Sequence, residues 1–173
     1  MTPRFSFRAV LAGIVVLWAS ACGFQPLYGV DAGGAHIVGE LAGIHIAEVN
    51  DRLGLAVRND LLDLVTPLGE PAEPRYVLRV SLFEERQGIA IERDATITRF
   101  TLTLTANYDL EDARTRMRVN SGTARATAAY NVLRAEFANV VAKRDAETRA
   151  ARVVAEEIKT RLSIHFARTP GAL

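Results

Sequence analysis

Side chains that could act as nucleophiles, acid–base groups or metal ligands are few and widely spaced. Beyond the N-terminal apolar segment the chain has three histidines and three serines, namely His36, His45, His165, Ser81, Ser121 and Ser163. Hydrolytic and metal-dependent sites need such groups at close spacing, as in G-x-S-x-G or H-E-x-x-H. Neither pattern occurs, and the chain contains no phosphate-binding glycine motif. The sequence therefore predicts no enzyme, no metal site and no cofactor.

The only cysteine, Cys22, follows a segment typical of an exported protein. Residues 1–8 hold two arginines and no acid, and residues 9–18 form an uninterrupted apolar run. Ten residues rise about 15 Å as a helix, too short for a hydrocarbon core of roughly 30 Å, but they fit the apolar core of a signal peptide. With Ala19, Ser20 and Ala21 before Cys22, the segment resembles the bacterial lipoprotein signal, although Ala19 stands where leucine is usual.

That resemblance implies cleavage between Ala21 and Cys22, followed by acylation of the Cys22 thiol and of the new amine. Two or three acyl chains hold a protein on a membrane far more firmly than one. Gly23 follows Cys22, and in Gram-negative lipoproteins an aspartate there usually causes retention at the inner membrane. We therefore expect an outer-membrane lipoprotein on the periplasmic side. The other interpretation is an ordinary secretory signal with a cysteine after the cleavage site by chance.

Charge excludes one class of partner. The 173 residues carry 21 Lys+Arg and 20 Asp+Glu, a net charge of +1, which becomes −1 once residues 1–21 are removed. Such a surface neutralises few phosphates, so we expect no nucleic-acid partner. Most cations are arginines, whose planar guanidinium binds carboxylates and phosphates bidentately. The candidates for lipid-phosphate or partner contacts are those predicted on strands, Arg79, Arg99, Arg118 and Arg125; a genome that favours arginine codons explains the composition equally well.

The mature chain predicts the order β-α-β-β-β-α. Alternating apolar residues predict strands at 44–46, 75–85, 96–110 and 118–130. Asn50 or Asp51 can cap a helix that ends before Pro67. In the third strand Ile97 is out of phase with the later apolar residues, which predicts a bulge near Thr98–Arg99. The fourth strand has small residues on one face, which would let a helix approach closely.

The C-terminal part predicts a long amphipathic helix over about residues 132–167. Its apolar stripe recurs every four residues, with a break near Asp145, and comprises Phe137, Val141, Ala146, Ala150, Val154, Ile158, Leu162 and Phe166. The predicted fold is α+β, a small, mostly antiparallel sheet with two helices packed on one face, a two-layer sandwich. The predicted domains are a removed signal peptide at 1–21, a lipid-anchored tether at 22–41, the folded domain at 42–168 and a flexible tail at 169–173.

The sequence around the cleavage site resembles a known family. Cys22-Gly23-Phe24, followed by Pro-Leu-Tyr-Gly at residues 26–29, is similar to the start of the lipopolysaccharide (LPS)-assembly lipoproteins (LptE) of alphaproteobacteria. The element order, the threonine-rich strand and Ala-Tyr-Asn at residues 129–131 before the last helix are also similar. The resemblance implies a plug in the lumen of the outer-membrane β-barrel LptD, which assists barrel assembly and LPS delivery, with LPS itself as a possible ligand.

Two other functions are open at this stage. One is a periplasmic auxiliary lipoprotein of a lipid or ABC-type transport system, a binding module that would have a free apolar groove. The other is a lipoprotein hydrolase, which the lack of a nucleophile motif disfavours.

Overall fold

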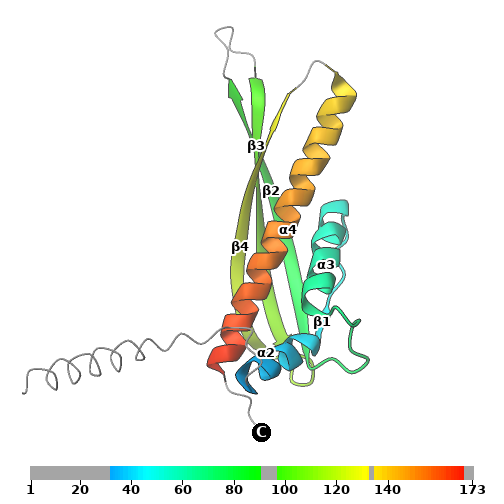
Figure 1. Ribbon diagram of the computed structural model, residues 1–173, viewed down its shortest axis with the longest axis vertical. Coiled ribbons are helices and arrows are strands. Elements are labelled where there is room, and N and C mark those ends of the chain that lie inside the picture. The colour runs from blue at the N-terminus through cyan, green and yellow to red at the C-terminus, as the bar shows by residue number, and fades with distance from the viewer. Residues whose placement is uncertain (1–31, 91–96, 133–134, 170–173) are drawn as a thin grey trace, which may run out of the picture.

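The computed structural model describes residues 32–90, 97–132 and 135–169. The predicted signal peptide, Cys22 and the first part of the tether lie outside the described residues, as do residues 170–173 of the predicted tail. The elements follow one another as α2 (Ala32–Ala42), β1 (Ile44–Ile46), α3 (Arg52–Val65), β2 (Tyr76–Ala90), β3 (Ile97–Asp112), β4 (Arg118–Asn131) and α4 (Glu136–Arg168) (Figure 1).

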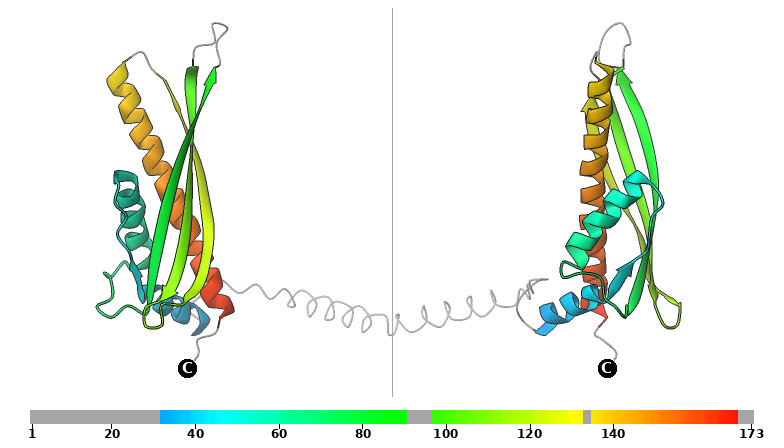
Figure 2. Two further views of the ribbon diagram at one scale, coloured as in Figure 1. Left: turned by 180° about the vertical axis from the view of Figure 1, so that it is seen from behind. Right: turned by 90° about the vertical axis from the view of Figure 1, so that its right-hand side faces the viewer.

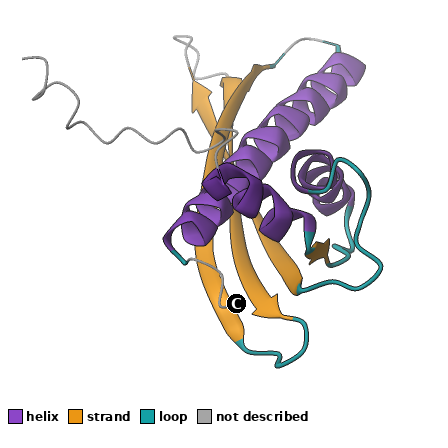
Figure 3. Cartoon of the chain, turned by 60° about the horizontal axis from the view of Figure 1, so that its bottom comes forward, coloured by secondary structure: helices purple, strands orange, loops and turns teal. Residues whose placement is uncertain are grey.

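The four strands form one sheet in the order β1-β2-β3-β4. β1 is parallel to β2, and the remaining pairs are antiparallel. A parallel pair needs a crossover connection, which α3 supplies. The helices lie on one side of the three long strands (Figures 2 and 3). The predicted α+β class is confirmed, with one helix more than expected.

Strict alternation in β3 explains why the sheet has one apolar face. The even-numbered residues from Leu102 to Leu110 are buried against the helices, whereas the threonines between them are half-exposed on the other face. The predicted bulge is confirmed, because Ile89 pairs with Arg99 while Ala90 pairs with Ile97, leaving Thr98 without a partner. β2 continues through Gly88 to Ala90, five residues beyond the predicted end of this strand.

α3 begins and ends as its sequence predicts. The side chain of Asp51 accepts a hydrogen bond from the N–H of Gly54 and caps the first turn. Val57 and Leu61 are fully buried on the face toward the core. The helix ends at Val65, two residues before Pro67.

α4 confirms the predicted stripe from Ala146 to Phe166, all of whose members are buried. It is unbroken over 33 residues, and at the predicted break Asp145 forms an i, i+4 ion pair with Arg149 at 2.9 Å. The extension of the stripe to Phe137 and Val141 is wrong, because these side chains are 80% and 49% exposed. The strands twist while the helix stays straight, so the first turns of α4 diverge from the sheet (Figures 1 and 2).

α2 occupies the second half of the segment predicted as a tether at 22–41. The three glycines at positions 33, 34 and 39 disfavour a helix, yet residues Ala32–Ala42 are helical. Ile37 and Leu41 are four residues apart and almost fully buried, and α2 packs against α4. Two buried side chains and contact with the body stabilise a helix that intrinsic propensity alone would not support.

The small residues of β4 provide room for α4 and for one large side chain of the sheet. Ala124, Ala126 and Ala128 are buried and face α4. Gly122 lies opposite Tyr108 of β3, and a Cβ atom at Gly122 would lie 2.7 Å from the Tyr108 hydroxyl. Gly122 is therefore fixed by a close contact within the sheet.

Substitution of Gly122 tests this packing. Gly122→Ala should lower the free energy of unfolding by about 1–3 kcal/mol, because Tyr108 is buried and must move. Gly39→Ala is the matched control, since nothing lies within 4 Å of its added Cβ on an exposed face of α2; it should be neutral or stabilising by up to about 1 kcal/mol. Urea unfolding measures both, and equal effects would contradict this account of Gly122.

Candidate partner interface

The outer face of the sheet lies opposite the helix layer (Figure 2), and most of its side chains are polar. On this face Thr101, Thr103 and Thr105 of β3 lie between two sets of neighbours, Gln87, Glu85 and Phe83 of β2 and Ala129, Thr127 and Arg125 of β4. Asn107 links the three strands, because its amide oxygen accepts from the Thr123 hydroxyl at 2.7 Å and its carbonyl accepts from the Ser81 hydroxyl at 3.4 Å. We call this surface the hydroxyl face. It is formed by odd-numbered residues of the three long strands and, beyond the register shift at Leu110–Glu111, by Arg118. Its hydroxyl and amide groups can hydrogen-bond a polar partner.

The four predicted arginines share the hydroxyl face but do not form one site. In the sheet register they lie at positions 99, 105, 109 and 111 of β3 or directly beside them, a span of about 40 Å. Arg79 pairs with Glu111, and Arg118 pairs with Asp109 at 3.0 Å. A single phosphate cannot engage all four arginines, because they are spread over this length. In addition, the two carboxylates already neutralise Arg79 and Arg118. Their role in binding stays a prediction.

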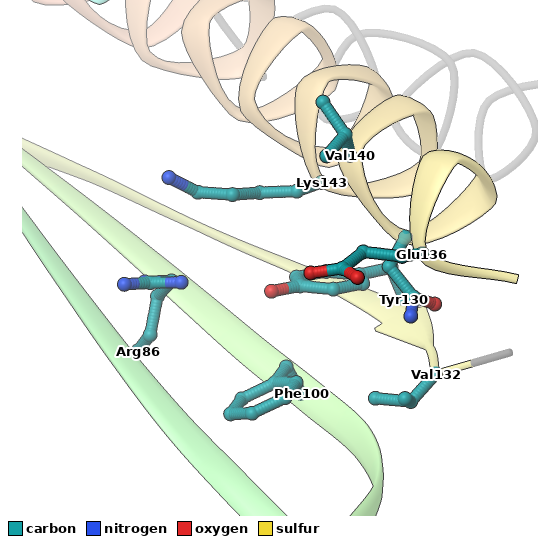
Figure 4. A pocket seen from close by; sticks show the side chains of 8 residues that line it. Arg86, Phe100, Tyr130, Val132, Glu136, Val140 and Lys143 are labelled. Carbon is teal, nitrogen blue, oxygen red and sulfur yellow. The ribbon is translucent and has the colours of Figure 1, made fainter. Parts of the chain in front are cut away.

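A cavity that sequence reasoning missed lies near the first turns of α4 (Figure 4). It measures about 280 Å³. Phe100 and Tyr130 stack with ring centroids 5.6 Å apart and form its apolar side. Its lining also includes Arg86, Val132, Glu136, Asn139, Val140 and Lys143. The one signal for this cavity in the sequence was the cross-strand pairing of Phe100 with Tyr130. The cations gave no signal, because Arg86 and Lys143 come from two separate elements, β2 and α4.

The cations of the cavity are held by carboxylates rather than free. Glu84 lies 3.4 Å from Arg86 and 3.6 Å from Lys143. Lys143 also pairs at 2.9 Å with Glu147, whose side chain is only 2% exposed and contacts Arg52 of α3 as well. Glu147 thus joins α3 to α4, while Lys143 joins α4 to β2. A buried carboxylate needs such partners, because desolvation is costly for an unpaired charge.

None of the histidines is arranged for catalysis or metal binding in the described part of the chain. His45 lies 3.1 Å from Glu70, and His36 lies 3.9 Å from Glu40. Burial lowers the pKa of His165, which favours the neutral form of its ring. The hydroxyls of Ser81 and Ser163 both donate to backbone carbonyls. No group of three potential metal ligands occurs among residues 32–90, 97–132 and 135–169, and none of the helices described there is both long and apolar enough to cross a bilayer.

The fold defines a small α+β protein in which the described helices cover one face of the sheet and leave the hydroxyl face uncovered. The chain matches the model of the LptE family, described as lipopolysaccharide-assembly, over residues 41–162. The protein therefore belongs to the LptE family of lipopolysaccharide-assembly lipoproteins. Membership of an assembly family agrees with the prediction that the chain is not an enzyme.

Solved structures share this fold. A lipoprotein from Caulobacter crescentus is 24% identical, with a TM-score of 0.69 over 78% of this chain and 98% of its own. A minor lipoprotein from Acinetobacter baumannii is 20% identical, with a TM-score of 0.55 over 75% of this chain and 93% of its own. A comparison with curated proteins found no significant sequence match.

Substitution of the buried Glu147 tests how α3 is attached to α4. Glu147→Gln should lower the free energy of unfolding by about 1–3 kcal/mol, because Arg52 and Lys143 lose the charge they share. Glu156→Gln is the control, since Glu156 is half-exposed and, among the described residues, forms an ion pair with Arg152 alone, at 3.4 Å; it should change stability by less than about 1 kcal/mol. Chemical unfolding measures both variants, and a neutral Glu147→Gln would contradict the proposed coupling.

Proposed function

We propose that the protein is anchored to the outer membrane through acyl chains on Cys22 and plugs the lumen of the LPS-assembly β-barrel LptD. In this role it assists assembly of the barrel and passage of LPS to the outer leaflet. Family membership supports a part in LPS assembly. The observation that carries the plug role is the hydroxyl face, because the lumens of outer-membrane barrels are lined by polar side chains.

The dimensions of the body suit this role. β3 has 16 residues, about 50 Å of extended chain, which exceeds a hydrocarbon core of roughly 30 Å. A plug of that length would contact the lumen over much of its height. Hydroxyl and amide groups are suitable contacts along such a wall, because they can donate and accept hydrogen bonds in many geometries.

The arrangement of elements suggests an orientation. α2 and the end of α4 lie at one end of the molecule, whereas the ends of β2 and β4 lie at the other (Figure 1). Cys22 precedes α2 by only ten residues, so acyl chains there would keep the α2 end near the periplasmic leaflet. The cavity beside Phe100 and Tyr130 would then lie deeper in the barrel, on the path of LPS.

Co-purification tests the plug. A tag after Leu173 should recover a stoichiometric, heat-modifiable β-barrel from outer membranes in mild detergent. Thr103→Trp, at the centre of the hydroxyl face, should reduce the recovered barrel by about tenfold, because a bulky indole disrupts close polar packing. Thr160→Trp, on an exposed face of α4, is the control. Recovery of the protein alone, or with an inner-membrane transporter, would contradict the plug and favour the auxiliary binding module.

Replacement of the acylated residue tests the anchor. Cys22→Ser should leave the folded domain unchanged, with the same melting temperature, because residue 22 precedes the described body. The variant should leave the membrane fraction in cells that lack the barrel, since it would carry no acyl chain. Fractionation with and without the barrel separates the two attachments. Full membrane retention without the barrel would contradict a purely lipid anchor.

A further inference from the structure

The outer edge of β2 lacks a neighbouring strand along most of its length. β1 pairs with β2 only from Tyr76 to Leu78, so no described strand lies beside the later residues on that side. The carbonyl of Leu78 accepts from the N–H of Ala47, and the pairing of β2 with β3 continues without a shift to Ile89. Because backbone direction alternates, five residues of β2 beyond its pairing with β1 direct their N–H and C=O groups to the open edge: Val80, Leu82, Glu84, Arg86 and Gly88.

The two outermost strands, by contrast, each have side chains bonded to the backbone of their outer edge. On β4, Glu157 accepts from the N–H of Arg125 at 3.0 Å, and Arg149 donates to the carbonyl of Ala129 at 3.2 Å. Such side-chain contacts prevent another strand from pairing with an edge. Two positions on the outer edge of β4, Arg125 and Ala129, are therefore occupied.

β1 is blocked in the same way from the other side of the sheet. Glu70 accepts from the N–H of Ile46 at 3.2 Å, and Arg58 donates to the Ile46 carbonyl at 3.1 Å. Glu70 and Arg58 also pair with each other at 3.0 Å. Within the described part of the chain no side chain bonds to the outward-facing backbone of residues 82–88, so this segment is an open edge of the sheet.

We propose that residues 82–88 of β2 bind an extended segment of the barrel partner by strand addition. The inference rests on the proposed function, which supplies the partner. Seven residues span about 23 Å, enough for four pairs of backbone groups. Strand addition obtains affinity from main-chain hydrogen bonds and specificity from alternate side chains, and both kinds of group are present on this segment.

The side chains of the open edge specify the bound segment. Phe83 is 64% exposed and Ile89 is 44% exposed, which favours apolar side chains opposite them on the outer face. On the inner face Glu84 and Arg86 carry opposite charges and lie close together, which favours a segment with one acid and one base at alternate positions. Cross-strand pairs of these kinds stabilise a sheet.

A second copy of this chain fits the edge less well. In the antiparallel two-fold register that pairs Glu84 with Arg86, Glu85 lies directly opposite its own copy. Like charges in that position are destabilising. The charge pattern therefore favours a different polypeptide over self-association.

Two substitutions at Arg86 separate the backbone from the side chain. Arg86→Pro and Arg86→Ala both remove the guanidinium, but only proline removes the N–H that faces the open edge. Neither change removes a hydrogen bond to β3, so both variants should keep the wild-type circular dichroism spectrum. In the tagged, acylated full chain, Arg86→Pro should retain about tenfold less barrel than Arg86→Ala.

The outcomes distinguish this proposal from the plug itself. If the wild-type chain recovers no barrel, the proposed function fails. If the wild-type chain recovers the barrel, and Arg86→Pro recovers as much barrel as Arg86→Ala, the strand-addition proposal is overturned and the plug role stands. A wild-type dimer that Arg86→Pro converts to a monomer would also overturn it in favour of self-association.

If Arg86→Pro fails to fold, hydrogen exchange of the wild-type chain tests the strand-addition proposal instead. In the complex, the amides of Leu82, Glu84 and Gly88 should exchange at least tenfold more slowly than in the isolated chain. The amides of Phe83, Glu85 and Gln87 should change little, because β3 already protects them. Uniform change across both sets, or no change, would overturn the proposal.

Discussion

The close approach of α4 to β4 is the constraint on which the rest of the structure depends. Ala124, Ala126 and Ala128 face a helix whose own contact side includes Ala146 and Ala150, and all five side chains are buried. Small residues on both surfaces let the backbones approach, but each buries little apolar area. Larger residues of β3 and the C-terminal half of α4 fill the remaining space. The helix must therefore be long, and it covers one face of the sheet while leaving the other to polar groups.

Much of this architecture follows from local periodicity. Alternation along β3 and the four-residue spacing from Ala146 to Phe166 predicted both layers, because each pattern allows only one face to be buried. The predicted cap at Asp51 and the bulge at Thr98 are also local features. The prediction failed where tertiary geometry decides, since the twist of the sheet exposes Phe137 despite its place in the stripe.

The candidate interface was less accessible to sequence reasoning. The side of the sheet that carries the arginines follows from alternation, but their neutralisation by Asp109 and Glu111 depends on cross-strand register. Glu147 lies 95 positions beyond Arg52, so no local pattern announces their contact. α2 was missed for a related reason, because its glycines argue against a helix while its stability comes from two side chains buried in the body.

The position of α4 in the chain has a consequence for biogenesis. A polypeptide that crosses a membrane with its N-terminus first releases β2, β3 and β4 before the helix that covers them. Until α4 follows, the side of β3 that carries Leu102, Leu104 and Leu110 faces water. Transiently exposed apolar surface and open strand edges favour aggregation. Export of the chain with its N-terminus first would thus include an interval in which this apolar face is uncovered, and that interval would end only when the 33-residue helix arrives.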